Sequence, residues 1–239
     1  MAVDLFARSE FAEIVPPRVI ARSLERFEIS RLFVVGADSD DQLHEFYGEY
    51  HSVFSWLGSQ QSTFGDNLNR VSNGRSKIFP FRSDSSMQHQ SDYYLHCLEV
   101  VDVEGRNPQV ALRPDAERWR DNFWSANSLQ HHPILTMAPG SGAREKNWPQ
   151  VQFLEIAQWW RKTTGGRVIV LMGPVEAERG GFDLLQVDCL TVSDLSLAQV
   201  AALLAWSIVY VGNDSGISHL AAAIGIPSVV LFGPGDPRQ

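Results

Sequence analysis

The feature that most constrains the fold is a regular alternation of apolar segments, glycine-containing loops and helical segments, which begins at Ile134. The apolar segments are nearly continuous, as in strands that are buried on both faces. This pattern predicts a parallel sheet covered by helices on both sides. The strands are predicted at Ile134–Ala138, Arg167–Met172, Cys189–Thr191, Ser207–Val211 and Ser228–Phe232, and the helices at Val151–Thr163, Ser196–Ala205 and Ile217–Ile224.

The preceding part of the sequence is less regular. Pro and Gly accumulate over residues 102–132, which also contain a helical segment opened by Pro114. We therefore predict an N-terminal domain at residues 1–104, a linker region at 105–130 and a second domain at 131–239. The expected N-terminal elements are helices at Val19–Phe27, Thr63–Val71 and Gln88–Val101 and strands at Ile29–Gly36, His51–Leu57 and Ser76–Phe81.

Composition excludes several classes of function. The 239-residue chain has a net charge of −8, which argues against sequence-independent nucleic-acid binding because such binding needs clustered positive charge. Its two cysteines, Cys97 and Cys189, do not form a disulfide framework or a CxxC pair, so we expect a reducing, cytoplasmic environment. No segment approaches the roughly 20 apolar residues of a membrane span, and the first residues lack the apolar core of a secretory signal.

Two loops that follow predicted strands carry residues suited to anion binding. The loop at 138–149 (APGSGAREKNWP) combines flexible glycines with the cations Arg144 and Lys146, so it predicts a phosphate site; a solvated loop anchored by Trp148 is the alternative. In the loop at 212–219 (GNDSGISH), Asp214 or Ser215 can cap the next helix, whose first N–H groups would face an anion.

A third loop, GPGDP at 233–237, reads as a rigid turn. Ligands of open parallel sheets bind at the carboxyl ends of the strands, where all three loops are predicted to lie. We therefore expect them to share one ligand site. His219, one turn inside the helix after the second loop, could donate to a phosphate there or serve only in packing.

The run from Ile134 to Gln239 resembles the C-terminal half of glycosyltransferase family 9, the ADP-heptose:lipopolysaccharide heptosyltransferases and their relatives. The matching pieces are PGSGAREKNWP, RVIVLMG with Glu176 after it, and GNDSGISHLAAAIGIPSVVLFGPGDP. The resemblance implies an α/β fold of GT-B type, with two Rossmann-like domains and parallel sheets, the N-terminal domain being incomplete here. It also implies an ADP-heptose donor, a lipopolysaccharide core or related glycan as acceptor, and inverting transfer without a metal or other cofactor.

The resemblance further assigns residues to the donor site. Ser141 and Lys146 match positions that contact the donor diphosphate, and Lys146 would stabilise the charge of the leaving group. Asp214 matches the position at the donor sugar. Glu176 matches the acid that holds the nucleotide ribose, with Glu178 as the competing choice. The full set of matched donor-binding positions is Ser141, Lys146, Glu176, Asp214, Ser215, Gly216 and His219.

The residue expected to act as catalytic base in this family is an aspartate in an N-terminal glycine-rich turn, and this sequence has no such turn. Asp4 is the first carboxylate but does not follow one, so the base is unknown. We expect a chain that lacks both ends of the family pattern and has weak or no transferase activity. The acceptor suggests peripheral contact with the cytoplasmic face of the inner membrane.

Two other readings stay open. One is a catalytically degenerate module that keeps the nucleotide-sugar site but has lost the base. The other is a different GT-B enzyme, such as a nucleotide-sugar epimerase, against which the Lys-x-Trp-Pro and Asp-Ser-Gly motifs argue.

Overall fold

The computed structural model describes residues 2–83, 89–100, 108–173, 185 and 189–234. The chain divides into two compact units. The C-terminal unit consists mainly of Asn107–Pro237 together with Glu10–Ala21, and the N-terminal unit mainly of Arg22–Arg106. Among the described residues, no helix combines the length and the apolar character needed to cross a membrane.

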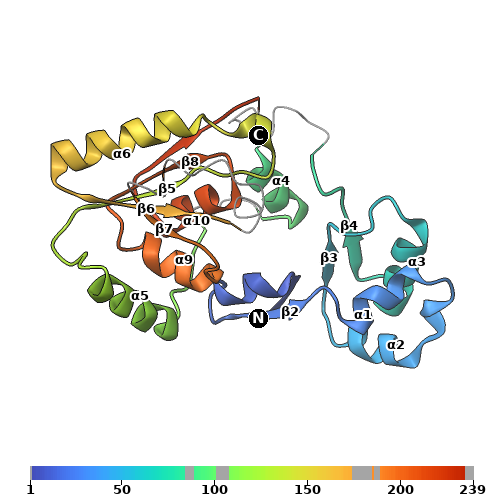
Figure 1. The fold of residues 1–239 in the computed structure, drawn as a ribbon. Helices are drawn as coiled ribbons and strands as arrows, with labels where there is room; N and C mark the ends of the chain where they lie inside the picture. The colour runs from blue at the N-terminus through green and yellow to red at the C-terminus, as the bar shows by residue number, and fades with distance from the viewer. Residues whose placement is uncertain (1, 84–88, 101–107, 174–184, 186–188, 235–239) are drawn as a thin grey trace. The chain divides into compact units, whose positions relative to one another are not determined.

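A five-stranded parallel sheet forms the centre of the C-terminal unit, with the strand order β7-β6-β5-β8-β9 (Figure 1). The first of these strands in the sequence, β5, lies in the middle of the sheet. The next two, β6 and β7, lie on one side of it, and the last two, β8 and β9, lie on the other. The strand order therefore reverses between β5 and β8, which is where open sheets of this kind bind ligands. The strands are β5 (Ile134–Ala138), β6 (Arg167–Leu171), β7 (Leu190–Val192), β8 (Val209–Asn213) and β9 (Ser228–Leu231).

Helices cover both faces of this sheet, and Figure 1 shows α6 on one side with α5 and α9 on the other. On the α6 side, Phe153 packs in one core cluster with Leu135 of β5. On the opposite side, Trp124 of α5 and Leu203 of α9 pack with Ile134. The helices are α5 (Pro114–Ala126), α6 (Gln150–Thr164), α9 (Leu197–Leu204) and α10 (Gly216–Ile224).

The strands and helices predicted for this unit are confirmed, with ends shifted by one or two residues. The α/β fold with a parallel sheet is likewise confirmed. Residues 105–130, predicted as a linker region, contain α5, and its Trp124 is buried in the core of the C-terminal unit. The predicted domain limits themselves stay a prediction.

The N-terminal unit contains a parallel pair of strands, β3 and β4, in which Val53 lies opposite Ser76. A separate two-stranded sheet joins β1 to β2. Leu32, Leu43, Phe64 and other apolar side chains form the core of the unit. The elements of this part of the chain are β1 (Val3–Ala7), η1 (Ser9–Glu13), β2 (Val19–Ser23), α1 (Phe27–Ser30), η2 (Arg31–Phe33), η3 (Ala37–Ser39), α2 (Asp41–Gly48), β3 (Val53–Ser55), α3 (Ser62–Val71), β4 (Ser76–Ile78) and α4 (Gln90–Cys97).

Two predictions for this part of the chain are wrong. The helix expected at Val19–Phe27 is the strand β2, because these residues pair with β1, a partner that local spacing does not reveal. The buried strand expected at Ile29–Gly36 is instead α1 followed by the 3-10 turn η2. Ile29 and Leu32 lie three residues apart and are both buried, whereas Val35 is 84% exposed, so the apolar run does not form a buried strand.

Candidate functional site

The loops that leave β5 and β8 meet at the point where the strand order reverses. The first loop runs from Pro139 to Pro149 and contains the short 3-10 turn η4 (Arg144–Lys146). The second consists of Asp214 and Ser215 and leads directly into α10. The two strands are direct neighbours in the sheet, since Ala138 pairs with Gly212, and this register brings the two loops side by side.

An ion pair connects the two loops. Lys146 Nζ donates to Asp214 Oδ2 over 2.7 Å, and the two residues are 68 positions apart in the sequence. Both side chains are partly accessible, with 36% exposure for Lys146 and 20% for Asp214. A lysine in this position is held in place by a carboxylate and is still open to an incoming anion. The structure therefore brings together the two residues that the sequence assigned to the diphosphate and the donor sugar.

Asn213 also joins the two loops, and the sequence analysis did not identify it. Its side chain is fully buried. Its Nδ2 donates to the carbonyl oxygen of Pro139 over 2.6 Å, and its Oδ1 accepts from the backbone N–H of Trp148 over 3.0 Å. The sequence signal that could have singled it out is a buried polar residue at the end of the otherwise apolar strand β8.

A buried hydroxyl network lies beneath the second loop. Ser218 Oγ donates to the carbonyl oxygen of Asn213 over 2.5 Å and lies 2.9 Å from the hydroxyl of Tyr210. Ser215 Oγ lies 3.4 Å from the same Ser218 oxygen. Burial raises the pKa of Tyr210 to about 12, so its hydroxyl stays protonated and can donate near neutral pH.

Two glycines allow the strand ends and loops to approach this closely. A Cβ atom on Gly212 would lie 2.1 Å from the hydroxyl oxygen of Tyr210 and 3.0 Å from the carbonyl oxygen of Ala138. A Cβ on Gly233 would lie 3.1 Å from both the Glu145 carbonyl oxygen and the Lys146 Cα. Gly233, which begins the third predicted loop, therefore packs directly on the first loop, whereas residues 235–237 of that third loop lie outside the described residues.

Ser141 braces the first loop from within. It is 5% exposed, and its Oγ lies 2.7 Å from the carbonyl oxygen of Ala143 and 2.7 Å from Oδ1 of Asn147. A hydroxyl carries a single proton, so it donates to one of these oxygens at a time. In this structure the Ser141 hydroxyl points into its own loop.

The first turn of α10 carries the remaining described site residues. Ser215 is the N-cap residue and has an extended backbone, but its side chain does not form a capping hydrogen bond. Gly216 begins the helix and is exposed, and His219 is exposed one turn further on. The expected capping role of Asp214 or Ser215 is thus replaced by the ion pair of Asp214 with Lys146.

Glu176 and Glu178 lie outside the described residues. Within the described ranges, no three His, Cys, Asp or Glu side chains gather in an arrangement that could hold a metal ion. This arrangement could bind an anion, since a partly exposed lysine lies beside the N-terminus of a nine-residue helix, where backbone N–H groups and the helix dipole favour negative charge.

Comparison with known proteins agrees with this geometry. The family model for glycosyltransferase family 9 (heptosyltransferase) matches residues 87–239. Lipopolysaccharide heptosyltransferase 2 of Escherichia coli (strain K12) is 29% identical over 139 residues, which cover 54% of this chain and 39% of that relative's length. The match thus spans well under half of that relative.

Solved structures share the fold. The glycosyltransferase family 9 structure from Veillonella parvula DSM 2008 aligns with a TM-score of 0.74 at 16% identity, covering 99% of this chain and 73% of that one. E. coli ADP-heptose lps heptosyltransferase II aligns with a TM-score of 0.70 at 19% identity, covering 99% and 77%. The fold is therefore of the GT-B type. Because the family model matches more than half of the chain and includes the loops that meet at Lys146 and Asp214, the chain belongs to glycosyltransferase family 9.

Proposed function

We propose that the chain binds ADP-heptose as the donor for transfer of the heptose, with inversion and without a metal ion, to a lipopolysaccharide core or related glycan, and that this transfer is weak. The observation that carries this proposal is the Lys146–Asp214 pair beside the N-terminus of α10. Support for the substrate class comes from the relatives, which are named lipopolysaccharide heptosyltransferases. One structural neighbour, E. coli heptosyltransferase WaaC, was solved with ADP-2-deoxy-2-fluoro heptose.

The proposed chemistry follows from charge. When the bond between heptose and ADP breaks, negative charge develops on the departing diphosphate. Lys146 and the first N–H groups of α10 would stabilise that charge, which is the role that a metal ion has in other transferases. Asp214 would then hold the donor sugar.

The remaining donor-site residues have proposed roles that match their positions. Ser141 shapes the first loop around the diphosphate, since its hydroxyl is used inside the loop. Ser215 and Gly216 present backbone N–H groups, and the exposed His219 donates to a phosphate oxygen. Glu176, with Glu178 as the competing choice, would hold the ribose. The base that activates the acceptor hydroxyl has no assigned residue.

We place this reaction in the cytoplasm, in peripheral contact with the inner membrane. A cytoplasmic location agrees with a chain that contains only two cysteines. The membrane contact is proposed because the acceptor class, a lipopolysaccharide core, is anchored in a bilayer.

Binding and turnover can be tested separately. We would titrate the purified chain with ADP, ADP-heptose, UDP and GDP and follow its thermal unfolding. A ligand at about 100 times its dissociation constant should stabilise the fold by roughly 2.7 kcal/mol. Transfer would be followed by mass spectrometry of a heptose-deficient lipopolysaccharide core. Selective stabilisation by ADP and ADP-heptose supports the donor assignment, and stabilisation without transfer would indicate a binding module.

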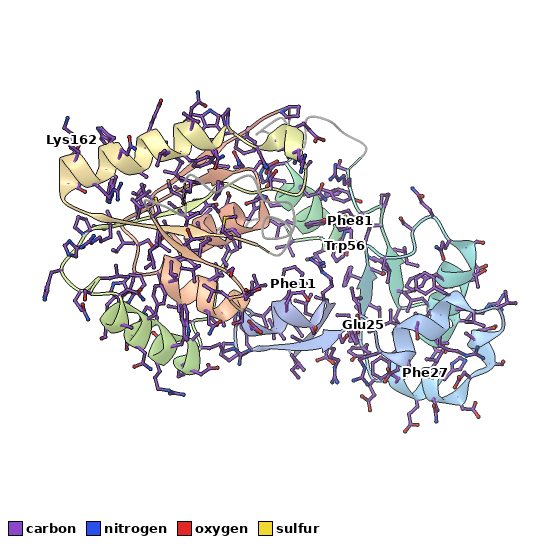
Figure 2. The ribbon with its side chains drawn as sticks, in the orientation of Figure 1. Phe11, Glu25, Phe27, Trp56, Phe81 and Lys162 are labelled. Atoms are coloured by element: carbon purple, nitrogen blue, oxygen red, sulfur yellow. The ribbon has the colours of Figure 1, made fainter. Side chains whose placement is uncertain are left out.

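Lys146→Gln is the decisive variant, with Lys162→Gln as its matched control. Lys162 is an exposed lysine in the last turn of α6, and Figure 2 shows it at the end of that helix. Loss of a charged hydrogen bond to the diphosphate should weaken ADP binding at least tenfold in Lys146→Gln. Equal ADP affinity in the two variants would contradict the proposed donor site.

A further inference from the structure

We propose that Asn213 is the positioning residue of the donor site, an inference that rests on the proposed function. Its single side chain contacts both ends of the first loop: Nδ2 donates to the Pro139 carbonyl and Oδ1 accepts from the Trp148 N–H. Lys146 lies two residues before Trp148, and Asp214 is the next residue after Asn213. One amide group therefore fixes the loop that carries Lys146 relative to the backbone that carries Asp214.

Asn213 is itself held from the opposite direction, so it cannot easily shift to accommodate a changed loop. Its carbonyl oxygen accepts from Ser218 Oγ, which is in turn supported by the Tyr210 hydroxyl. The N–H of Asp214 donates to the carbonyl oxygen of Leu231 in β9 over 3.1 Å. Because this side of Asn213 is anchored to α10 and the sheet, a disturbed side-chain contact should displace the first loop and Lys146 with it.

Few residue types can make both of the side-chain contacts of Asn213. The position needs one hydrogen-bond donor and one acceptor on the same short head group, and full burial requires that group to be neutral. An ionised carboxylate would place a negative oxygen against the carbonyl oxygen of Pro139 and could not donate. A serine hydroxyl is too short to reach both Pro139 and Trp148. Asparagine meets all of these requirements.

Asn213→Asp tests this with almost no change of shape. A protonated carboxyl group has one donor and one acceptor, like the amide it replaces, whereas the ionised form has no donor. Burial raises the pKa of a carboxyl group. The introduced carboxyl group should therefore be protonated at about pH 6 and ionised at about pH 9. The loss of loop position and of ADP affinity should then appear as the pH rises.

The readout is the dissociation constant for ADP, measured by calorimetry and divided by the wild-type value at each pH. This division cancels the pH dependence of ADP binding that both proteins share. The titratable and charged groups on the surrounding elements that contribute to it are Arg144, Glu145, Lys146, Tyr210, Asp214 and His219. We expect the dissociation constant of Asn213→Asp to exceed that of the wild type roughly tenfold or more at about pH 9 and about twofold at about pH 6.

Amide hydrogen exchange gives a second readout that does not need a ligand. The N–H of Trp148 should lose protection in Asn213→Asp at high pH, because repulsion between the ionised carboxylate and the Pro139 carbonyl oxygen displaces the loop from its acceptor, and it should regain protection at low pH. If neither the wild type nor Asn213→Asp binds ADP, but exchange at Trp148 changes in this way, the positioning role of Asn213 stands and the proposed function fails.

Asn67→Asp is the matched control. Asn67 is a buried asparagine of the N-terminal unit, 4% exposed, and its Nδ2 donates to the carbonyl oxygens of Leu32 and Val34, each over 2.9 Å. The same chemical change there should lower the melting temperature without changing ADP affinity or exchange at Trp148. A general loss of stability is thereby separated from a loss of loop position.

If Asn213→Asp does not fold at high pH, Asn213→Ser provides a neutral variant that cannot span both contacts. It should show weakened ADP binding and faster exchange at Trp148 at every pH. Wild-type ADP affinity together with wild-type exchange at Trp148, either in folded Asn213→Asp at high pH or in folded Asn213→Ser at any pH, would overturn the proposal. A defect of equal size at both ends of the pH range in Asn213→Asp would also overturn it.

Discussion

At the scale of single residues, the proposed donor site pairs its lysine with a carboxylate of the same chain. Lys146 Nζ lies 2.7 Å from Asp214 Oδ2, so a diphosphate must share or replace a carboxylate as the partner of this lysine. Charge-assisted hydrogen bonds to phosphate are strong enough to make that exchange favourable. In the proposed donor site, Asp214 would therefore oppose binding of the diphosphate and favour binding of the sugar.

This gives a prediction for Asp214→Asn. Removing the negative charge should tighten the binding of ADP about threefold or more, because the carboxylate no longer repels the diphosphate or competes for Lys146. The same change should weaken ADP-heptose about tenfold relative to ADP, since the contact to the sugar is lost. Calorimetric titration with ADP and with ADP-heptose measures the two changes in affinity. An equal loss of affinity for both ligands would contradict the prediction.

A second prediction concerns Gly212, where the strand end has no space for a side chain. A Cβ there would meet the Tyr210 hydroxyl oxygen at 2.1 Å and the ring carbon that bears it at 2.6 Å. Gly212→Ala should therefore lower the free energy of unfolding by about 2 kcal/mol or more, because the buried ring must move. Adding Tyr210→Phe should recover part of this loss by removing the oxygen.

Gly48→Ala serves as the control in the same denaturation experiment. Gly48 is the last residue of α2, and a Cβ there would find no atom within 4 Å. It should leave stability unchanged or slightly increased. Equal stabilities for Gly212→Ala and Gly48→Ala would show that the strand end adapts freely.

At the scale of elements, the start of α9 is specified by a capping box. Ser196 Oγ accepts from the N–H of Gln199 over 3.3 Å, and the Gln199 side chain accepts from the N–H of Ser196 over 2.9 Å. Glu13, from the segment before β2, accepts from the N–H of Ala198. Three side-chain oxygens thus satisfy N–H groups at this helix N-terminus.

We expect Ser196→Ala to reduce the free energy of unfolding of the C-terminal unit by about 1 kcal/mol, the usual effect of losing an N-cap side chain. Urea denaturation followed by circular dichroism would measure this. Ser193→Ala is the comparison, since Ser193 is exposed and hydrogen-bonds only its neighbour Asp194 among the contacts described. A similar effect for the two serines would mean that the box does not stabilise α9.

The elements also show how far sequence reasoning reaches. The strands from Ile134 onward were predictable because they are compact apolar runs, and those in the middle of the sheet, β5, β6 and β8, are almost entirely buried. The segment from Val19 to Gly36 was not, because β2 depends on pairing with β1 and because Ile29 and Leu32 are buried by packing with distant residues. Local spacing contains no information about such partners.

The same limit separates the site residues that were predicted from the one that was missed. Lys146 and Asp214 lie in loops whose composition is unusual, so the sequence marks them directly. Asn213 contacts two backbone groups, the carbonyl of Pro139 and the amide of Trp148, and a polar residue at a strand end does not show which backbone groups it will meet. Its role became visible only when the loop geometry was known.

At the scale of the whole molecule, the proposed donor site belongs to one of two compact units. The residues that form it, from Pro139 to Gly233, all lie within the C-terminal unit. ADP should therefore slow hydrogen exchange in the peptides that contain Lys146, Asp214 and Ser218. It should leave the peptides of α2 and α3 unchanged. Protection of the N-terminal unit by ADP alone would show that the two units are coupled.

The order of the strands along the chain also sets the order in which the parts of the site appear during synthesis. Asn213 and Pro139 are 74 residues apart, so the first loop leaves the ribosome well before its partner exists. At the usual rate of roughly 5–20 residues per second, this interval is about 4–15 s. For that time the Lys146 loop has neither its amide brace nor its carboxylate partner. A nascent chain should therefore be unable to capture nucleotide until β8 has emerged and inserted beside β5.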